Sequence, residues 1–496
     1  MRLSSPPLTR TALLAALLAG PLAGCDLPAL PGAASPGSVP SAFRAAAPEQ
    51  ATPPTPVWPE AAWWHGFGSP ELDRLIATAE SGNFDIAAAT ARIVQADAAL
   101  RSAGAPLLPT LTAAPEQQWT RYSYARRGTS SPLHATGDYY ETRTSSLPFS
   151  ASYEIDFWGR LRASREAARQ SALSSRFDRS NVALTTVTSV ASTWITVLAD
   201  RDRLAVARHN LADAEEILAA IRGQFSAGLT SQLDVAQEEA VVAQLRAQVP
   251  ALQNTLEQEI NGLGILVGQP PEAITVTTET LAGLTLPEVA AGLPSELLAR
   301  RPDVAQAEAA LAAQGANLKV ARADFFPQVT LTASTGWQAY ALNTLFGPGS
   351  LFFTAAATAS QTVFDNGAKR AAFDEAKGRY DELLADYRKA VVQAFTDVEN
   401  ALTAYRRTTE QEALQSEAVA RAQRAADISR AQLQAGTINI VTQLQTQTTL
   451  YTDLDTLAQV RLARATALVN LYKALGGGWT RGQVTAPETK LFQGVL

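Results

Sequence analysis

Two long stretches of the chain mix polar and apolar residues in a pattern typical of helices, at 160–224 and 368–434. Neither contains proline, and both are rich in Ala, Gln, Arg, Glu and Leu. These residue types favour helix, so each stretch predicts one helix on the order of 100 Å long. In the second stretch the apolar positions alternate steps of three and four: Leu384, Tyr387, Val391, Ala394, Val398, Ala401 and Tyr405. This spacing predicts helices packed side by side, which an ordinary helix bundle would also satisfy.

The same Ala-Gly interruption follows both long stretches. The segments "QFSAGLTSQLDVAQ" and "QLQAGTINIVTQLQ" place Gly228 and Gly436 at matching points. A glycine with positive φ ends one helix and lets another begin, and Thr230 or Ser231, together with Asn439, are the expected N-caps. Each interruption therefore predicts the tip of a helical hairpin.

Strict alternation of apolar and polar residues marks several strands. Within 147–157, the residues that share one face are Leu147, Phe149, Ala151, Tyr153, Ile155 and Phe157. In the second half, 329–334 alternates in the same way, and 354–362 carries a row of Thr and Ser between alanines. This pattern is typical of transmembrane β-strands, although a soluble antiparallel sheet with one wet face has the same alternation.

Aromatic residues border these strands, as in the interfacial girdles of membrane proteins: Trp119, Tyr122, Tyr124, Tyr139, Tyr140, Trp337, Tyr340, Phe352 and Phe353. Two strands in each half give four in the chain, whereas single-chain bacterial barrels begin at about eight. Four strands alone would leave unpaired backbone groups in lipid. If the strands cross a membrane, several chains must share one barrel.

An internal repeat organises the chain. The segment beginning at Asp85 matches the one beginning at Asp303, and Gly159 matches Gly367. Each half has the same order: a helix (70–103 and 295–323), two strands, and a long helical hairpin. We therefore divide the chain into a first repeat at 60–280, a second repeat at 281–480 and a C-terminal tail at 481–496. One extra segment falls in the first half between Pro109 and Gly159, where we expect a longer loop.

The N-terminus predicts export and lipidation. Residues 1–24 combine two arginines with the short apolar core "TALLAALLAG", as in a signal peptide. The only cysteine, Cys25, follows in "LAGC", which resembles the bacterial lipobox. Residues 25–59 are rich in Pro and Ala and predict an extended tether. No other apolar run reaches the length of a transmembrane helix.

Composition argues against other classes of function. The formal charge is −6 and no Lys/Arg stripe is present, so nucleic acid is not expected as a partner. Three separated histidines and one cysteine form no metal-ligand cluster. No nucleophile elbow or phosphate-binding glycine loop is present. We expect no catalytic residue, metal or cofactor.

The chain resembles the TolC-type outer membrane efflux family, in its NodT-like lipoprotein branch. The segments that carry the resemblance are "SYEIDFWGRLRAS", "PSELLARRPDVAQAEAALAAQGANLKVARADFFPQVTLTAS", the paired Ala-Gly tips and "NLYKALGGGW". The resemblance implies a mainly α fold with a membrane β-barrel portion. Three chains would form one twelve-stranded barrel in the outer membrane, continued by a long periplasmic α-helical barrel.

The resemblance also implies partners and sites. The exit channel would receive small molecules from an inner-membrane pump, of the RND type, through a periplasmic adaptor. The hairpin tips would contact the adaptor through Ala227, Gly228, Leu229 and Thr230, and through Ala435, Gly436 and Thr437. The family's acidic gate positions fall on Thr442 and Gln445, a neighbouring apolar constriction falls on Val441, and Asp234 remains acidic at the first tip. These residues predict an apolar, amide-lined periplasmic gate.

Alternatives remain at this level. A type I protein-secretion channel has the same fold, and a lipid-anchored periplasmic coiled-coil scaffold would share the anchor and the hairpins. Asp26, directly after the lipidated cysteine, is a retention signal for the inner membrane in enteric bacteria. The four strands favour the outer membrane, with a periplasmic extension.

Overall fold

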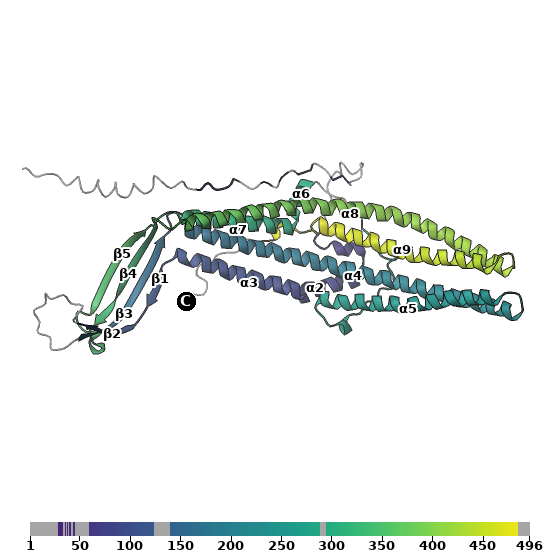
Figure 1. The fold of residues 1–496 in the computed structure, drawn as a ribbon, viewed down its shortest axis with the longest axis horizontal. Coiled ribbons are helices and arrows are strands. Elements are labelled where there is room, and N and C mark those ends of the chain that lie inside the picture. Colours follow the sequence, from purple (N-terminus) through teal and green to yellow (C-terminus); the bar gives the residue numbers. More distant parts are fainter. Residues whose placement is uncertain are drawn as a thin grey trace, which may run out of the picture.

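The computed structural model describes residues 28–32, 35, 37, 39–40, 43–44, 59–123, 139–287 and 294–484. The expected signal peptide, Cys25 and Asp26, much of the tether, Tyr124 and most of the C-terminal tail lie outside these residues. The described chain forms a long rod, with a β-sheet at one end and two helical hairpins reaching to the other (Figure 1).

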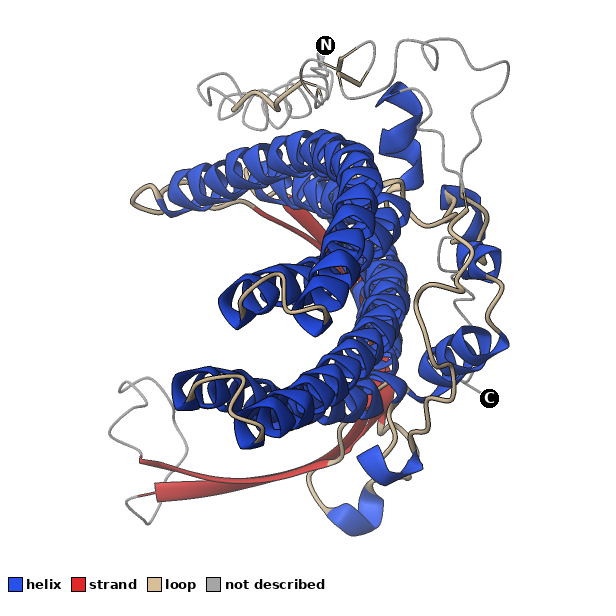
Figure 2. Cartoon of the chain, turned by 90° about the vertical axis from the view of Figure 1, so that its right-hand side faces the viewer, coloured by secondary structure: helices blue, strands red, loops and turns tan. Residues whose placement is uncertain are grey.

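Two hairpins of long helices account for most of the rod. They consist of α4 (Arg160–Ser226) with α5 (Gln232–Val267), and of α8 (Ala368–Gln434) with α9 (Ile440–Ala474). The first helix of each hairpin is 67 residues long, which confirms the prediction from proline-free sequence. In the view from the hairpin tips, the long helices follow an arc, and the short helices and loops gather along its outer side (Figure 2).

The single helix expected at the start of each half is a pair of helices. The pairs are α2 (Pro70–Gly82) with α3 (Phe84–Gly104), and α6 (Pro294–Arg300) with α7 (Pro302–Ala323). Asn83 breaks the first pair because its side chain caps α3, accepting from the backbone N–H groups of Asp85 and Ile86. In the second pair, the residue before Pro302 is extended, as the proline ring requires.

The described strands form one antiparallel sheet, in which two short strands lie end to end beside the same neighbour. They are β1 (Thr110–Ala113), β2 (Glu116–Ser123), β3 (Tyr139–Ile155), β4 (Gln328–Ala339) and β5 (Leu351–Ser360). Both β1 and β2 pair with β3 in one unbroken register, so they are one strand interrupted at Pro115. The sheet order is then β1/β2, β3, β4, β5, which confirms the four expected strands within the part of the chain that the structure describes.

Two sequence predictions about the strands need correction. The third strand ends at Ile155, so Phe157 lies beyond it and is 65% exposed. The extra residues of the first half do not lie only in a loop, because β3 has 17 residues while β5 has 10. The first pair of strands is longer than the second.

The strand register gives the sheet one mainly apolar face and one mainly polar face. Across the strands, Ala151 pairs with Leu111 and Ala333, while Tyr153 pairs with Leu331. The opposite face carries Ser and Thr pairs such as Ser150 with Ser334, whose hydroxyls lie 3.1 Å apart. No described helix covers either face of the sheet in Figure 1, and on the apolar face Leu111 and Phe353 are each 73% exposed. An uncovered apolar face on a sheet is typical of a lipid-facing surface.

The main core lies where the helices of both halves meet. Trp194, Leu198 and Ile195 of α4 pack with Ile76 and Leu468 in one buried cluster. A second cluster follows the seam predicted on α8, including Tyr387, Val391, Ala394, Val398 and Ala401. One stretch of α4 is apolar enough to span a membrane by length and composition, with a mean hydropathy of 1.6, but 56% of it is buried inside the chain. That stretch is therefore core helix.

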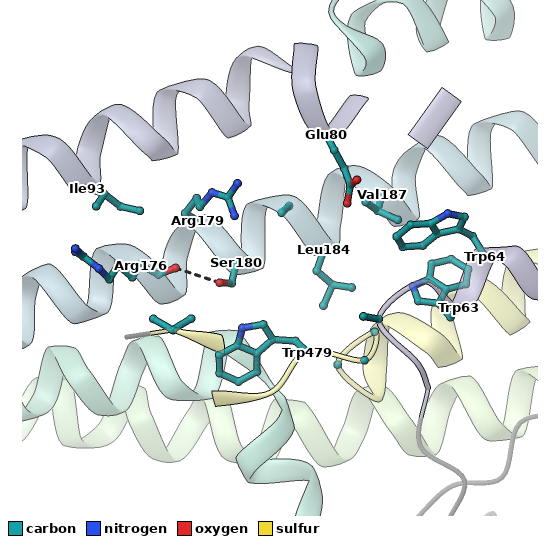
Figure 3. A pocket seen from close by; sticks show the side chains of 16 residues that line it. Trp63, Trp64, Glu80, Ile93, Arg176, Arg179, Ser180, Leu184, Val187 and Trp479 are labelled. Carbon is teal, nitrogen blue, oxygen red and sulfur yellow. Dashed lines mark hydrogen bonds between the residues drawn. The ribbon is translucent and has the colours of Figure 1, made fainter. Parts of the chain in front are cut away.

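Short 3-10 helices complete the described chain: η3 (Trp63–Phe67), η4 (Ala105–Leu107), η6 (Pro271–Ala273), η7 (Leu342–Thr344) and η8 (Arg481–Gln483). A cavity of about 370 Å³ lies beside η3, between α3, α4 and the segment that follows α9. Figure 3 shows Trp63, Trp64 and Trp479 on its walls. Its α4 residues lie about 40 to 50 positions before the hairpin tip, or roughly 60–75 Å along the helix, so this cavity is separate from the tips.

Candidate channel gate at the hairpin tips

Both hairpin tips reverse the chain in the same way. Gly228 and Gly436 have φ angles of 76° and 71°, which L residues rarely adopt. The next residue donates back across the helix end: Leu229 N–H to the Gln224 carbonyl, and Thr437 N–H to the Gln432 carbonyl, each at 2.9 Å. These bonds are those of a helix C-cap, and they confirm the turn predicted from the two Ala-Gly pairs.

The tip residues expected to contact an adaptor lie at the end of the rod. Ala227, Gly228 and Leu229 are exposed, and so are Ala435, Gly436 and Thr437, whereas Thr230 is half-buried. The first tip carries three exposed apolar side chains: Phe225 at 45%, Leu229 at 79% and Leu233 at 65%.

The carboxylate of Asp234 is engaged in capping α5. Ser231 is the N-cap, and it forms a reciprocal capping box with Asp234. Asp234 Oδ2 accepts from the Thr230 hydroxyl at 2.6 Å, the Ser231 hydroxyl at 2.7 Å and the Ser231 N–H at 2.8 Å. These bonds lower the pKa of Asp234. The acid at the first tip is thus held against its own helix end.

Thr442 occupies the matching position at the second tip. Its N–H and its hydroxyl both donate to Asn439 Oδ1, at 3.0 and 2.9 Å, so Asn439 is the N-cap of α9, as expected. Val441 and Gln445 instead share one face of α9. They line an open hollow of about 600 Å³ with Leu444, Thr448, Thr449, Thr452 and Asp453.

The structure therefore groups only part of the predicted gate. Val441 and Gln445 lie together, while Asp234 and Thr442 are hydrogen-bonded to the N-cap residues Ser231 and Asn439. The sequence prediction missed Asp453, which lines the same hollow. Asp453 lies eight residues after Gln445, a spacing that places both residues on one side of an α-helix. This spacing is the sequence signal from which Asp453 could have been predicted.

A tip seam joins the two hairpins near their ends. We define it by Ile217 and Ile221 of α4, Val235 of α5, Leu433 of α8, and Ile440 and Leu444 of α9, which form one apolar cluster. Farther from the tips, Arg430 of α8 contacts Asp213 of α4 at 3.5 Å. The seam means that each tip is held by contacts with the other hairpin as well as within its own.

The described residues contain no group of three His, Cys, Asp or Glu side chains that could hold a metal ion. A membrane-type sheet, joined to long helical hairpins whose tips lie far from it, is the architecture of an outer-membrane channel subunit.

Comparison with known proteins gives the family. The sequence profile described as "Outer membrane efflux protein" matches residues 75–269 and 293–477. The chain belongs to this family, and it is an outer membrane efflux channel protein with a periplasmic extension.

Named relatives and solved structures agree with this assignment. The chain is 42% identical to the pyoverdine export outer membrane protein OpmQ of Pseudomonas aeruginosa, over 84% of the chain and 87% of OpmQ. It is 32% identical to the probable efflux pump outer membrane protein TtgC of Pseudomonas putida, over 85% and 86%. Its fold is similar to the outer-membrane channel OprN, with a TM-score of 0.82 and 25% identity, over 91% of this chain and 99% of OprN. CusC gives a TM-score of 0.80 and 27% identity, over 91% and 100%.

Proposed function

We propose that three copies of this chain form one passive exit channel. Each chain supplies four strands to a twelve-stranded barrel, and the long helices continue the channel as an α-helical tube through the periplasm. The observation that carries this proposal is the sheet itself. Its apolar face is uncovered, and its outer strands, β1/β2 and β5, have no partner on one side among the described residues. Closure with other copies pairs those edges.

The mass of the solubilised protein tests the assembly. We expect mature protein in detergent to have three times the mass of one chain. We also expect Cys25→Ser to abolish lipidation while the protein still requires detergent, because the barrel alone holds it in the membrane. A water-soluble monomer after Cys25→Ser would support a tethered scaffold instead.

The proposed cell-envelope arrangement follows the chain. Residues 1–24 are removed as a signal peptide, Cys25 carries the lipid, and 25–59 is the tether. Repeats at 60–280 and 281–480 form the channel, with 481–496 as a tail. The tips contact a periplasmic adaptor that links the channel to an inner-membrane pump of the RND type. The exposed Phe225, Leu229 and Leu233 favour an apolar contact at the first tip.

The proposed cargo is a small molecule. The 42% identical relative is named for pyoverdine export, so a siderophore is the first substrate to test. Accumulation of pyoverdine-type siderophore in the periplasm of a strain that lacks the channel, and its release on complementation, would support this assignment. Unchanged release in the deletion strain would exclude it.

We propose that the periplasmic gate is formed by Val441 and Gln445, with Thr442 and Asp234 holding the helix ends beside it. Gln445 is exposed in the hollow of α9 and carries no charge. A ring of Gln445→Asp substitutions would attract cations, most strongly at low salt where screening is weak. We therefore expect higher cation selectivity of single channels at low salt, and unchanged selectivity would remove Gln445 from the gate.

A further inference from the structure

A buried acid lies close to the tip seam and has no hydrogen-bond partner among the residues that the structure describes. Glu238 of α5 is 0% exposed, and neither of its carboxylate oxygens accepts a hydrogen bond. Buried polar groups in proteins are almost always paired, because an unpaired charge in an apolar surrounding is costly. An unpaired carboxylate at this position therefore calls for a physical role.

Apolar side chains lie on both sides of Glu238 along its helix face. Val235, three residues before it, packs into the tip seam. Val242, four residues after it, packs with Leu218 of α4 and with Leu450 of α9. At these spacings the three side chains share one face of α5. Glu238 therefore lies between two apolar layers that join the hairpins.

Tyr451 is the polar neighbour whose charge interaction with Glu238 is resolved, and no described residue hydrogen-bonds to the Glu238 carboxylate. Tyr451 of α9 is within electrostatic range, and its hydroxyl accepts from Gln447. Tyr451 also lies within electrostatic range of Asp213 of α4 and Arg430 of α8.

The Arg430 guanidinium contacts Asp213 at 3.5 Å, and His209 lies 3.8 Å from that same carboxylate. Further side-chain atoms in this region lack hydrogen-bond partners: Asn210 Oδ1, Gln237 Oε1, Gln447 Oε1 and Arg430 Nε. The surroundings therefore do not compensate a negative charge on Glu238.

Burial raises the pKa of Glu238 from 4.5 to about 7. For an acid whose pKa is raised in the packed state, ionisation opposes packing. The packed seam is therefore most stable below about pH 4.5, and it loses stability as the pH rises through about 7.

We propose that Glu238 is a proton-controlled latch between the two hairpins. With the proton bound, the carboxyl group is neutral and the seam stays packed. When the proton leaves, the charged carboxylate draws water between the hairpins and favours their separation at the tips. The inference rests on the proposed gate at the tips, because separation of the hairpins there widens the exit.

Single-channel recording of the full-length protein tests the latch. In planar bilayers at constant ionic strength, from about pH 5.5 to 8.5, we expect the open fraction of wild type to rise about tenfold, with a midpoint near 7. Glu238→Gln cannot ionise, so its open fraction should stay at the low-pH value throughout. Glu238→Met should behave in the same way, and it serves as the second variant if the amide does not assemble.

The matched control is Glu239→Gln at the next position, which is exposed and pairs with Arg222 at 2.7 Å. We expect this variant to keep the rise in open fraction near pH 7. The latch would be overturned if the open fraction of wild type did not rise with pH. It would also be overturned if the same rise persisted in Glu238→Gln or Glu238→Met. Absence of channel currents from every protein, wild type included, would overturn the proposed exit channel instead.

Discussion

Ser231 and Asp234 cap the same helix from both directions. The Asp234 N–H donates to the Ser231 hydroxyl at 3.3 Å, and the Ser231 N–H donates to Asp234 Oδ2 at 2.8 Å. The second hairpin has only half of this arrangement, because Thr442 stands where Asp234 would be. Asn439 alone supplies the capping oxygen there. The two tips are alike in backbone but differ in how the second helix begins.

Asp234→Ala should therefore loosen the first tip. Loss of the reciprocal cap is expected to cost about 1 kcal/mol at the start of α5. Thr442→Ala should cost less, because Asn439 still accepts from the backbone N–H of residue 442. Amide hydrogen exchange at 231–238 and 439–446 measures both effects. Equal loss of protection at the two tips would contradict this asymmetry.

Glu71 of α2 is joined by four hydrogen bonds to α4 and to the segment that follows α5. Its carboxylate accepts from the N–H and hydroxyl of Thr277 at 2.5 and 2.7 Å, from the Thr278 N–H at 3.2 Å and from Trp194 Nε1 at 3.0 Å. Burial raises the pKa of Glu71, but the hydrogen bonds outweigh it and lower the pKa from 4.5 to about 2. That shift corresponds to roughly 3 kcal/mol of stabilisation.

The stabilisation from Glu71 is complete above about pH 4.5 and is lost as the pH falls through about 2. Glu71→Gln should remove most of it at neutral pH and flatten the acid limb of the stability curve. Denaturant midpoints of the detergent-solubilised protein across this pH range measure both changes. Glu80→Gln, an exposed position in the same helix, is the control. A variant at Glu71 that keeps the wild-type acid limb would refute the assignment.

Features that depend on local sequence were predictable. Gly228 and Gly436 mark the tips because a positive φ at that point needs glycine. The alternation around Tyr153 predicts the strand, because a sheet displays every second residue on one face. The two 67-residue helices followed from the absence of proline over long stretches.

Features that depend on distant contacts were missed. Asn83 divides a helix in two because its amide also donates to the Leu266 carbonyl at 2.8 Å, 183 residues away. Glu238 resembles its exposed neighbour Glu239 in sequence, and only the packed structure shows that Glu238 is buried.

Gly336 allows β3 and β4 to approach closely. A Cβ at this position would lie 2.1 Å from the Leu147 carbonyl oxygen and 2.8 Å from Pro148 Cα. Gly336→Ala must push the strands apart, at a cost of about 1–3 kcal/mol. We expect a lower yield of assembled protein in the outer membrane fraction. Thr335→Ala on the same strand removes a bond to the Phe352 carbonyl without a clash, and it should assemble near the wild-type level. Equal yields of Gly336→Ala and wild type would show that the strands absorb the extra methyl group.

Arg301 joins the break between α6 and α7 to the long helices. It is 8% exposed, and it donates to Asp303 at 3.0 and 2.6 Å, to Asp397 of α8 at 2.9 Å and to the Ala474 carbonyl at 3.3 Å. Arg301→Met removes the guanidinium group from these contacts and leaves Asp397 with the Gln393 amide and Asp303 with the Val304 N–H as donors. The Asp303 and Asp397 side chains are 32% and 35% exposed, so we expect a cost below the roughly 3–5 kcal/mol of breaking a fully buried pair.

We expect Arg301→Met to unfold at a markedly lower temperature than wild type, as measured by thermal denaturation in detergent. The double variant Arg301→Met with Asp397→Asn should recover part of this loss, because it removes one of the two negative charges. The control is Arg379→Met. Arg379 forms an exposed pair with Glu382 on α8 at 2.5 Å, and exposed pairs contribute about 0–1 kcal/mol. If Arg301→Met and Arg379→Met were equally stable, the contacts of Arg301 with α8 and α9 would not hold the second repeat together.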